Sequence, residues 1–504
     1  MDEPQSLPVA PASIPPSTPP SGIAKLTFNL KMLLLLLSKV PLLTQVAILH
    51  VLKLSEPAKY VDLKSNLAVS LMRSLLAPST PLPISYAQNL TTQNPEVKGK
   101  IWVSLYASPP PPETDIRDSL LRALESMRDP NASGSSSTRV PSLAHVEAEW
   151  TGYRALASET EALPSISEAA KYDEMMKECK EPTTVLYFHG GAYYLCDPAT
   201  HRPIASKLAE LTKGRCYSVR YRLAPQHPFP SALLDALVSY FALLYPPPDA
   251  YHEAVKPGHV VFAGDSAGGN LALALLQLVL QLRRLDARIQ WYGEERQVPL
   301  PAGVCCVSPW IDITHSAPPW QEEKPHLFDY VPKPRPEIDA KIPPCKIWPA
   351  SPPRKRIYVD DDLAAHPLAT LIMNRTWEGS PPIWMCTGWE LLSFENKAFA
   401  MKLIADGVPL VFEEYEAMPH CFALVLSSLP VSRRCVESWT DFIRRVMENP
   451  GAIESRATYI KSPTLEEIPL RFDELLDVKL EDVQAMVVSK VGEAAKQSEI
   501  TAKL

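Results

Sequence analysis

The stretch His259-Val-Val-Phe-Ala-Gly-Asp-Ser-Ala-Gly-Gly-Asn270 decides the fold. An apolar, β-branched run leads into a glycine-flanked Gly-Asp-Ser-Ala-Gly turn, and a long apolar segment follows over residues 271–285. We interpret this as a strand, a sharp turn and a helix. A turn of the form G-x-S-x-G lifts the serine hydroxyl clear of a sheet, and its glycines tolerate a strained backbone. The pentapeptide is a weak signal alone, but its place between strand and helix predicts that Ser266 is a nucleophile.

Composition narrows the classes of protein. The chain has 504 residues, of which 46% are hydrophobic and 21% charged, as is ordinary for a globular protein with a substantial core. The net charge of −7 gives no support to nucleic-acid binding. Nine cysteines without a C-x-x-C pair indicate neither a zinc site nor a dense disulfide framework. The 53 prolines cluster in segments that we interpret as linkers and irregular insertions.

The N-terminal region divides into two parts. Residues 1–22 are rich in proline and serine, and we expect them to be disordered. Residues 23–56 contain the apolar run 30–53, which is long enough to span a bilayer but is interrupted by Lys39 and Pro41. We favour a pair of interfacial helices on a membrane surface, with a single-span anchor or a helix on the protein's own core as alternatives. A cleaved signal peptide fits less well, because no small-residue cleavage site closes the run.

Strand and helix patterns alternate over residues 57–450, which predicts a mainly parallel, twisted α/β sheet with helices on both faces. We expect strands over 98–107, 144–154, 185–188, 216–221, 260–263, 303–307, 383–386 and 410–415, and helices over 61–76, 115–127, 229–244, 271–285 and 431–447. Cap elements are assigned to 57–180, a Pro-rich insertion to 313–362 and a charged helical tail to 451–504. Ligands bind such sheets beyond the carboxyl ends of the strands.

A candidate oxyanion hole follows the strand 185–188. The stretch His189-Gly190-Gly191-Ala192 contains paired glycines, which let the backbone turn its N–H groups toward a developing negative charge. A plain strand-to-loop turn is the competing interpretation. The serine turn favours the oxyanion hole, with Gly190, Gly191, Ala192 and Ala267 as the candidate residues.

A base and an acid should follow the serine in the chain. His420, just after the strand 410–415, is the histidine that fits, because a loop at a strand end can reach the serine. The loop after the strand 383–386 has no aspartate, and Glu390 lies at the strand end. Glutamate can orient an imidazole as aspartate does. The alternatives are Glu395 and Asp312, and surface or capping roles compete for all three carboxylates.

Four motifs together carry a family resemblance: His189-Gly-Gly, Tyr221-Arg-Leu-Ala-Pro225 with His227-Pro-Phe-Pro230, Gly264-Asp-Ser-Ala-Gly-Gly269, and Pro419-His-Cys-Phe422. Over residues 183–445 the chain resembles the hormone-sensitive-lipase branch of the α/β hydrolases, with arylacetamide deacetylase-like and steryl acetyl hydrolase-like enzymes. The resemblance implies an α/β-hydrolase fold, with oxyanion donors at Gly191, Ala192 and Ala267. The chain departs from the family at Ala192, where a glycine is usual, and at Glu390-Leu-Leu, where Asp-Pro-Leu is usual.

These observations predict a serine carboxylester hydrolase acting on a lipophilic ester, plausibly acetylated or short-acyl, through Ser266, His420 and Glu390. The chemistry of such a triad needs no metal and no organic cofactor. Because of residues 23–56 we expect association with a membrane surface, with the endoplasmic reticulum and the cytoplasm as candidate compartments. The alternative is a non-catalytic ligand-binding protein on a hydrolase fold, and a peptidase is a third possibility. The sequence does not indicate an oligomeric state.

Overall fold

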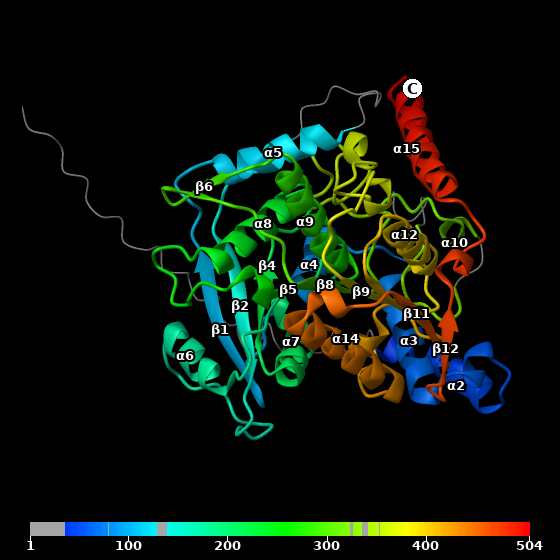
Figure 1. The fold of residues 1–504 in the computed structure, drawn as a ribbon. Helices are drawn as coiled ribbons and strands as arrows, with labels where there is room; N and C mark the ends of the chain where they lie inside the picture. Colours follow the sequence, from blue (N-terminus) through cyan, green and yellow to red (C-terminus); the bar gives the residue numbers. More distant parts are fainter. Residues whose placement is uncertain are drawn as a thin grey trace, which may run out of the picture.

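A computed structural model describes residues 36–78, 80–128, 139–322, 326–334, 341–351 and 353–503. The segment 1–22, expected to be disordered, lies outside these residues, as does the first part of the apolar run 30–53. Figure 1 shows how the described elements are arranged.

One mixed sheet forms the centre of the molecule. Its strands are β1 (Ile101–Ser108), β2 (Val146–Tyr153), β3 (Thr184–Phe188), β4 (Arg215–Arg220), β5 (Val260–Asp265), β8 (Gly303–Val307), β9 (Ile383–Thr387), β10 (Leu410–Tyr415), β11 (Arg456–Ile460) and β12 (Glu467–Leu470). They lie in the order β1-β2-β4-β3-β5-β8-β9-β10-β11-β12, and all neighbours from β4 to β11 are parallel. The expected mainly parallel α/β sheet is therefore confirmed. A separate hairpin consists of β6 (Ile289–Trp291) and β7 (Glu294–Arg296).

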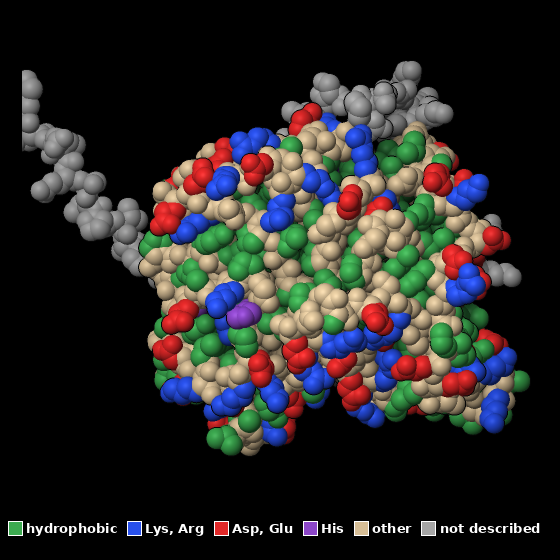
Figure 2. All heavy atoms as spheres, viewed as in Figure 1, with side chains coloured by type: hydrophobic (Ala, Val, Ile, Leu, Met, Phe, Trp, Pro, Cys, Tyr) green, Lys and Arg blue, Asp and Glu red, His purple; other side chains and the backbone are tan. Residues whose placement is uncertain are grey.

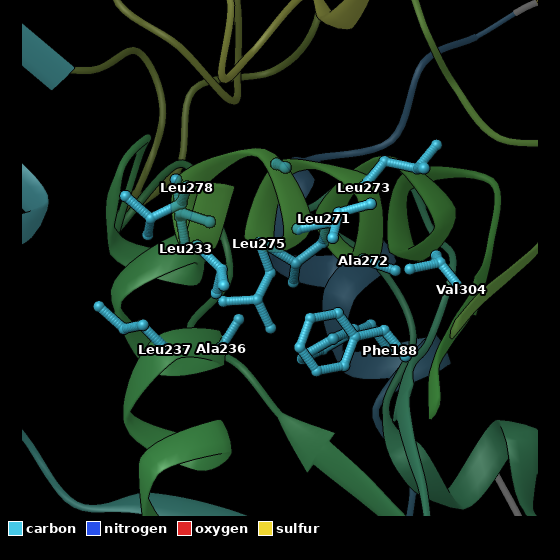
Figure 3. Packing of buried hydrophobic residues seen from close by; sticks show 14 of the residues in the cluster. Phe188, Leu233, Ala236, Leu237, Leu271, Ala272, Leu273, Leu275, Leu278 and Val304 are labelled. Atoms are coloured by element: carbon cyan, nitrogen blue, oxygen red, sulfur yellow. The ribbon is translucent and has the colours of Figure 1, made fainter. Parts of the chain in front are cut away.

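Helices cover both faces of this sheet. On one face, α7 (Pro198–Thr212) packs with α14 (Pro430–Glu448). The cluster on the other face takes side chains from α5 (Asp115–Met127), α6 (Glu168–Glu178), α8 (Ser231–Leu244), α9 (Ala267–Arg284), α12 (Ser393–Ala405) and α15 (Leu480–Lys503). Figure 3 shows Leu271 and Leu275 of α9 packed toward Phe188 of β3. Each buried leucine contributes about 1.5–3 kcal/mol, so this packing holds the start of α9 firmly against the sheet.

Most of the expected elements lie where the sequence predicts them. The strands 303–307 and 410–415 coincide with β8 and β10, and the other expected strands differ only at their ends. The helix expected over 271–285 begins earlier, at Ala267, because the turn after Ser266 leads directly into it. The sequence did not predict α6 or α7. Helix α7 contains an internal proline, Pro203, a residue that disfavours a helix interior.

The prediction of a wholly helical tail over 451–504 is wrong. Before α15, the chain adds β11 and β12 to the sheet, and β11 pairs in parallel with residues 411–415 of β10. Without β11, one edge of β10 would present unpaired N–H and C=O groups. Ala457 and Ile460 bury their side chains in the same strand. These contacts are non-local, so the local pattern of the tail did not indicate them.

The N-terminal helices are α2 (Val40–Val51), α3 (Leu63–Leu76) and α4 (Ile84–Thr91), and α2 packs along α3. In Figure 1, α2 and α3 lie near β12. No residue of α2 is buried. Within the described residues, no helix is both long enough and apolar enough to cross a bilayer. The described part of the insertion 313–362 includes the short helix α10 (Pro318–Gln321).

The face of the molecule seen in Figure 2 mixes Lys and Arg side chains with Asp and Glu side chains. Neither sign of charge forms an extended field across the visible described surface. A basic stripe of the kind that follows a nucleic-acid backbone is therefore not found on this face.

Candidate active site

Ser266 occupies the turn between β5 and α9 with φ +54° and ψ −121°, a conformation that L-residues rarely adopt. Such strain persists only where the surrounding structure holds it. The backbone N–H of Ser266 donates to the carbonyl of Val307 at 2.9 Å, and the N–H of Trp310 donates to the carbonyl of Ser266 at 3.0 Å. A Cβ on Gly268 would lie 2.0 Å from the carbonyl oxygen of Phe188, so the turn requires glycine there. The serine side chain is half-buried.

The loop after β3 places two backbone N–H groups beside this turn without protein acceptors. Gly191 has φ +105°, and a Cβ there would lie 2.3 Å from the carbonyl oxygen of Leu195. Ala192 follows with φ +51°. In the described part of the chain, no group accepts the N–H of Gly191 or of Ala192. Ala267 begins α9, and the first N–H groups of a helix have no partner within the helix.

Gly190 differs from the other candidates for the oxyanion hole. Its N–H donates to Oδ1 of Asp265 at 3.2 Å, so this group is already engaged. A Cβ on Gly190 would lie 2.3 Å from Oδ2 of Asp265, which explains the need for glycine there. The available donors are therefore those of Gly191, Ala192 and Ala267. Gly190 instead anchors the loop.

His420 and Glu390 are in direct contact. Nδ1 of His420 donates to Oε2 of Glu390, and both side chains are buried. An ionised carboxylate can only accept, so Nδ1 carries the proton and Nε2 is left as the acceptor nitrogen. Ser308 and its neighbour link this pair to the turn of Ser266. Oγ of Ser308 accepts the N–H of Cys421 at 3.2 Å, and the carbonyl of the preceding Val307 accepts the N–H of Ser266. Adjacent residues thus hold the loops of the serine and the histidine.

The second oxygen of Glu390 is fully hydrogen-bonded. Oε1 accepts from Oγ of Ser308 at 2.6 Å, from Oγ1 of Thr387 at 2.8 Å and from the N–H of Gly388 at 3.1 Å. These donors orient the carboxylate toward His420. The three hydrogen bonds to Oε1 also explain how a glutamate can take the place of an aspartate, because they fix the end of the longer side chain.

The contact shifts both pKa values toward the charged pair. Burial disfavours the imidazolium of His420, but the neighbouring carboxylate of Glu390 outweighs it and raises the pKa of the histidine. Burial also opposes ionisation of Glu390, but His420 and the hydrogen bond from Ser308 lower the pKa of that carboxyl. The site therefore favours an imidazolium when a proton arrives at His420.

Neither alternative carboxylate contacts the histidine ring. Oε1 of Glu395 accepts the N–H groups of Ile311 and Asp312, and burial raises the pKa of this carboxyl well above its usual value. Asp312 accepts from the backbone and hydroxyl groups of Thr314 and Ser316, and so caps its own loop. The structure thus places Glu390, rather than these two, beside His420.

Sequence reasoning missed three side chains that support the site. Asp265 carries the loop of Gly190, Ser308 holds Glu390, and Asp329 lies under the loops of His420 and Glu390. The first was visible as the variable position of the serine motif. The second follows directly after a predicted strand, where functional residues were expected. Nothing in the pattern around Asp329 could have indicated its place.

Comparisons with known proteins place this chain in a family. The family described by the α/β hydrolase fold matches residues 185–424. An acetyl-hydrolase from Streptomyces hygroscopicus is 30% identical over 264 residues, which cover 52% of this chain and 75% of that protein. An esterase from Acinetobacter venetianus is 26% identical over 271 residues, covering 54% of this chain and 77% of that protein. The chain therefore belongs to the α/β hydrolase family, as its sequence motifs predicted.

A solved structure shows the same fold. The crystal structure of EstE5 soaked with p-nitrophenyl butyrate aligns with a TM-score of 0.50 at 21% identity, and the alignment covers 76% of this chain and 99% of that one.

Proposed function

We propose that the protein is a serine carboxylester hydrolase in which Ser266 is the nucleophile, His420 the base and Glu390 the acid. The contact between Glu390 and His420 carries the proposal, because it leaves Nε2 of a buried imidazole as a proton acceptor. His420 and the strained Ser266 both follow the carboxyl ends of strands, at the same edge of the sheet. The names of similar proteins, an acetyl-hydrolase and an esterase, support the same reaction class.

In the first half of the reaction, Oγ of Ser266 attacks the ester carbonyl carbon while Nε2 of His420 takes the hydroxyl proton. Glu390 stabilises the resulting imidazolium. The N–H groups of Gly191, Ala192 and Ala267 hold the oxyanion, and donors of this kind are worth about 10²–10³ in rate each. The tetrahedral adduct then collapses, its ester C–O bond breaks, and His420 returns the proton to the departing alkoxide.

Water completes the cycle. It attacks the acyl-serine while His420 takes its proton, and the second collapse releases the carboxylic acid and restores Ser266. His420 returns each proton in the same half-reaction in which it takes it. The cycle therefore needs no further proton donor or acceptor. No metal or organic cofactor takes part in the proposed steps.

The substrate that we propose is a lipophilic ester with an acetyl or other short acyl group, met at a membrane surface. Support comes from α2, in which no residue is buried and whose residues Val40, Leu42, Ile48, Leu49 and Val51 are exposed. Exposed apolar positions in neighbouring turns suit the boundary between headgroups and acyl chains. The acetyl-hydrolase name of a similar protein supports the short acyl group.

The test is hydrolysis of p-nitrophenyl acetate, butyrate and longer esters by the wild type and by Ser266→Ala, with peptide anilides alongside. We expect turnover of the short esters by the wild type, none above background by the variant, and no cleavage of the anilides. Equal rates for wild type and Ser266→Ala at every chain length would refute catalysis and favour a ligand-binding protein. Faster cleavage of anilides than of esters would make the protein a peptidase.

A further inference from the structure

Asp329 lies in the insertion between β8 and β9, in a described segment that we call the strap (residues 326–331). Its side chain is buried, with 1% of the residue exposed. No ion pair is formed by this carboxylate within the described part of the chain. Burying an unpaired carboxylate is costly unless hydrogen bonds replace its hydration, so its partners explain why it is there.

The partners come from three different segments. Oδ1 of Asp329 accepts the N–H of Tyr330 at 2.7 Å and the N–H of Val331 at 3.3 Å, both in the strap. The same oxygen accepts the N–H of His420 at 3.2 Å, and Oδ2 accepts the N–H of Leu391 at 2.8 Å. One carboxylate therefore links the loop of the base to the residue that follows Glu390.

Side-chain packing places the strap against the same two loops. The ring of Tyr330 meets the imidazole of His420 edge to face, with centroids 6.0 Å apart. Phe328 packs against Trp389, the residue before Glu390, with centroids 5.3 Å apart. The strap thus touches both the base and the loop of the acid without touching the contact between them.

The N-terminal helices hold the strap in turn. Nε of Arg73, in α3, donates to the carbonyl of Asp329 at 2.8 Å, and Nη2 donates to the carbonyl of Leu327 at 2.8 Å. Tyr60 completes the aromatic cluster, with its centroid 5.6 Å from that of Phe328. Segments more than 250 residues apart in the chain are joined here, since Arg73 and Asp329 differ by 256 positions.

We propose that Asp329 is a positioning residue that fixes the loops of His420 and Glu390 relative to each other, and that Arg73 holds it in place. The inference rests on the proposed function, because it assigns Asp329 to the geometry of that triad. A misplacement of about 1 Å in such a triad can lower the rate on the order of 10²-fold, so a fixed link between the two loops has a direct effect on turnover.

The test compares Asp329→Asn with Asp312→Asn in the hydrolysis of p-nitrophenyl butyrate across pH. Asp312 is the matched control, because it is a buried aspartate directly before the same insertion, and its side chain bonds only to Thr314 and Ser316 of its own loop. For Asp329→Asn we expect kcat to fall on the order of 10²-fold with KM little changed. An amide cannot accept at both of its ends, so the link to Leu391 or to His420 is lost.

The pH profile separates positioning from a loss of stability. Removing a negative charge near His420 disfavours the imidazolium, so the acid limb of kcat/KM should move to lower pH in Asp329→Asn. It should stay in place in Asp312→Asn, although that variant also loses stability. The charged and titratable groups that face the pair are Glu390, Asp265, His326, Arg73, Tyr330 and Cys421, and all of them are unchanged in both aspartate variants.

Arg73→Gln keeps the test decisive if Asp329→Asn does not fold. It leaves the carboxylate in place but removes the tether to the strap together with one positive charge. We therefore expect a lower kcat, with an acid limb that does not move to lower pH as it does in Asp329→Asn. Wild-type kcat in Arg73→Gln, or the same profile shift in both aspartate variants, would overturn the inference. If the wild type hydrolyses no ester, the proposed function fails and the inference with it. Normal wild-type turnover with an unaffected Asp329→Asn defeats the inference alone.

Discussion

The carboxylate of Asp265 accepts the backbone N–H of Gly190 at 3.2 Å, so the residue before Ser266 anchors the loop that carries the proposed oxyanion donors. The same carboxylate accepts the hydroxyl of Tyr187 at 2.7 Å and lies 3.3 Å from Nε2 of His201. Burial opposes its ionisation, but His201 and Tyr187 outweigh burial and lower its pKa. Asp265 therefore links the turn of Ser266 to the loop of Gly191 and Ala192.

We expect Asp265→Asn to lower kcat by about 10- to 10²-fold, because the loop that aims Gly191 and Ala192 loses its anchor. KM should change little, since the donors act on the oxyanion. The measurement is steady-state kinetics on p-nitrophenyl butyrate. Asp235→Asn is the control: this buried aspartate of α8 pairs with Arg222 and should affect stability alone. Equal kcat values for the two variants would contradict the anchoring role.

Glu390→Gln should lower kcat by about 10⁴-fold, because an amide can stabilise the wrong tautomer of His420. The wild-type activity should fall as pH drops through the pKa of His420, which lies above the usual value. Without the carboxylate this pKa falls, so the residual activity should persist to lower pH. The measurement is the pH dependence of kcat/KM. Glu390→Asp retains the charge and should recover part of the loss.

Glu395→Gln is the matched control for the acid. Burial keeps the pKa of Glu395 well above its usual value, so a neutral amide resembles the protonated side chain that it replaces. We expect kcat within about threefold of wild type and an unchanged acid limb. A threefold change in rate corresponds to a change of less than ~1 kcal/mol in the activation free energy. A large loss in Glu395→Gln together with an active Glu390→Gln would reverse the assignment of the acid.

Ser308→Ala removes a donor to Glu390 and the acceptor of the Cys421 N–H. A buried polar group that loses its partner costs about 1–3 kcal/mol, so we expect a loss of about 2 kcal/mol in the free energy of unfolding. The kcat should fall about tenfold, because the carboxylate loses one of its orienting bonds. Urea unfolding and kinetics measure the two effects.

Ser239→Ala provides the comparison for that experiment. Ser239 is buried in α8, and its hydroxyl has no hydrogen-bond partner among the described residues. Alanine is also the better helix former. Stability should be equal or higher in Ser239→Ala. If both alanine variants lose the same stability, the bond between Ser308 and Glu390 contributes nothing.

The proposed membrane contact predicts a loss of vesicle binding when charges are placed at the end of α2. Val51, Leu52 and Leu54 are 66%, 60% and 70% exposed. Burial of one such side chain is worth about 1.5–3 kcal/mol, so replacing all three by glutamate should lower binding by more than about 10²-fold. Sedimentation of the full chain with phosphatidylcholine vesicles measures it. Deletion of residues 1–54 should likewise release the protein.

Leu156→Glu is the control for this surface. Leu156 is 97% exposed and lies just after β2, away from α2 in the sequence. Binding should be unaffected in this variant. Vesicle binding that survives the triple replacement and the deletion would exclude α2 as the contact.

The parts of the fold and site that the sequence predicts share one property. In each of them, a residue type suited to catalysis follows a segment whose local pattern indicates a strand. The serine turn, His420 and Glu390 each follow a strand that the sequence predicts, and parallel strands bring such ends to one edge of the sheet. The unpredicted parts depend on partners far along the chain. Asp329 bonds to Leu391 and His420, which are 62 and 91 positions away. No local pattern records contacts of that kind.

The edge strand β12 also affects association between copies of the molecule. β12 has four residues, and its Pro469 lies opposite Thr458 of β11. Proline has no N–H to donate, and short strands with charged residues such as Glu467 resist adding a further strand. This edge therefore disfavours sheet-to-sheet aggregation between chains. Such protection would matter most at a high local concentration, as on the membrane surface that we propose for this protein.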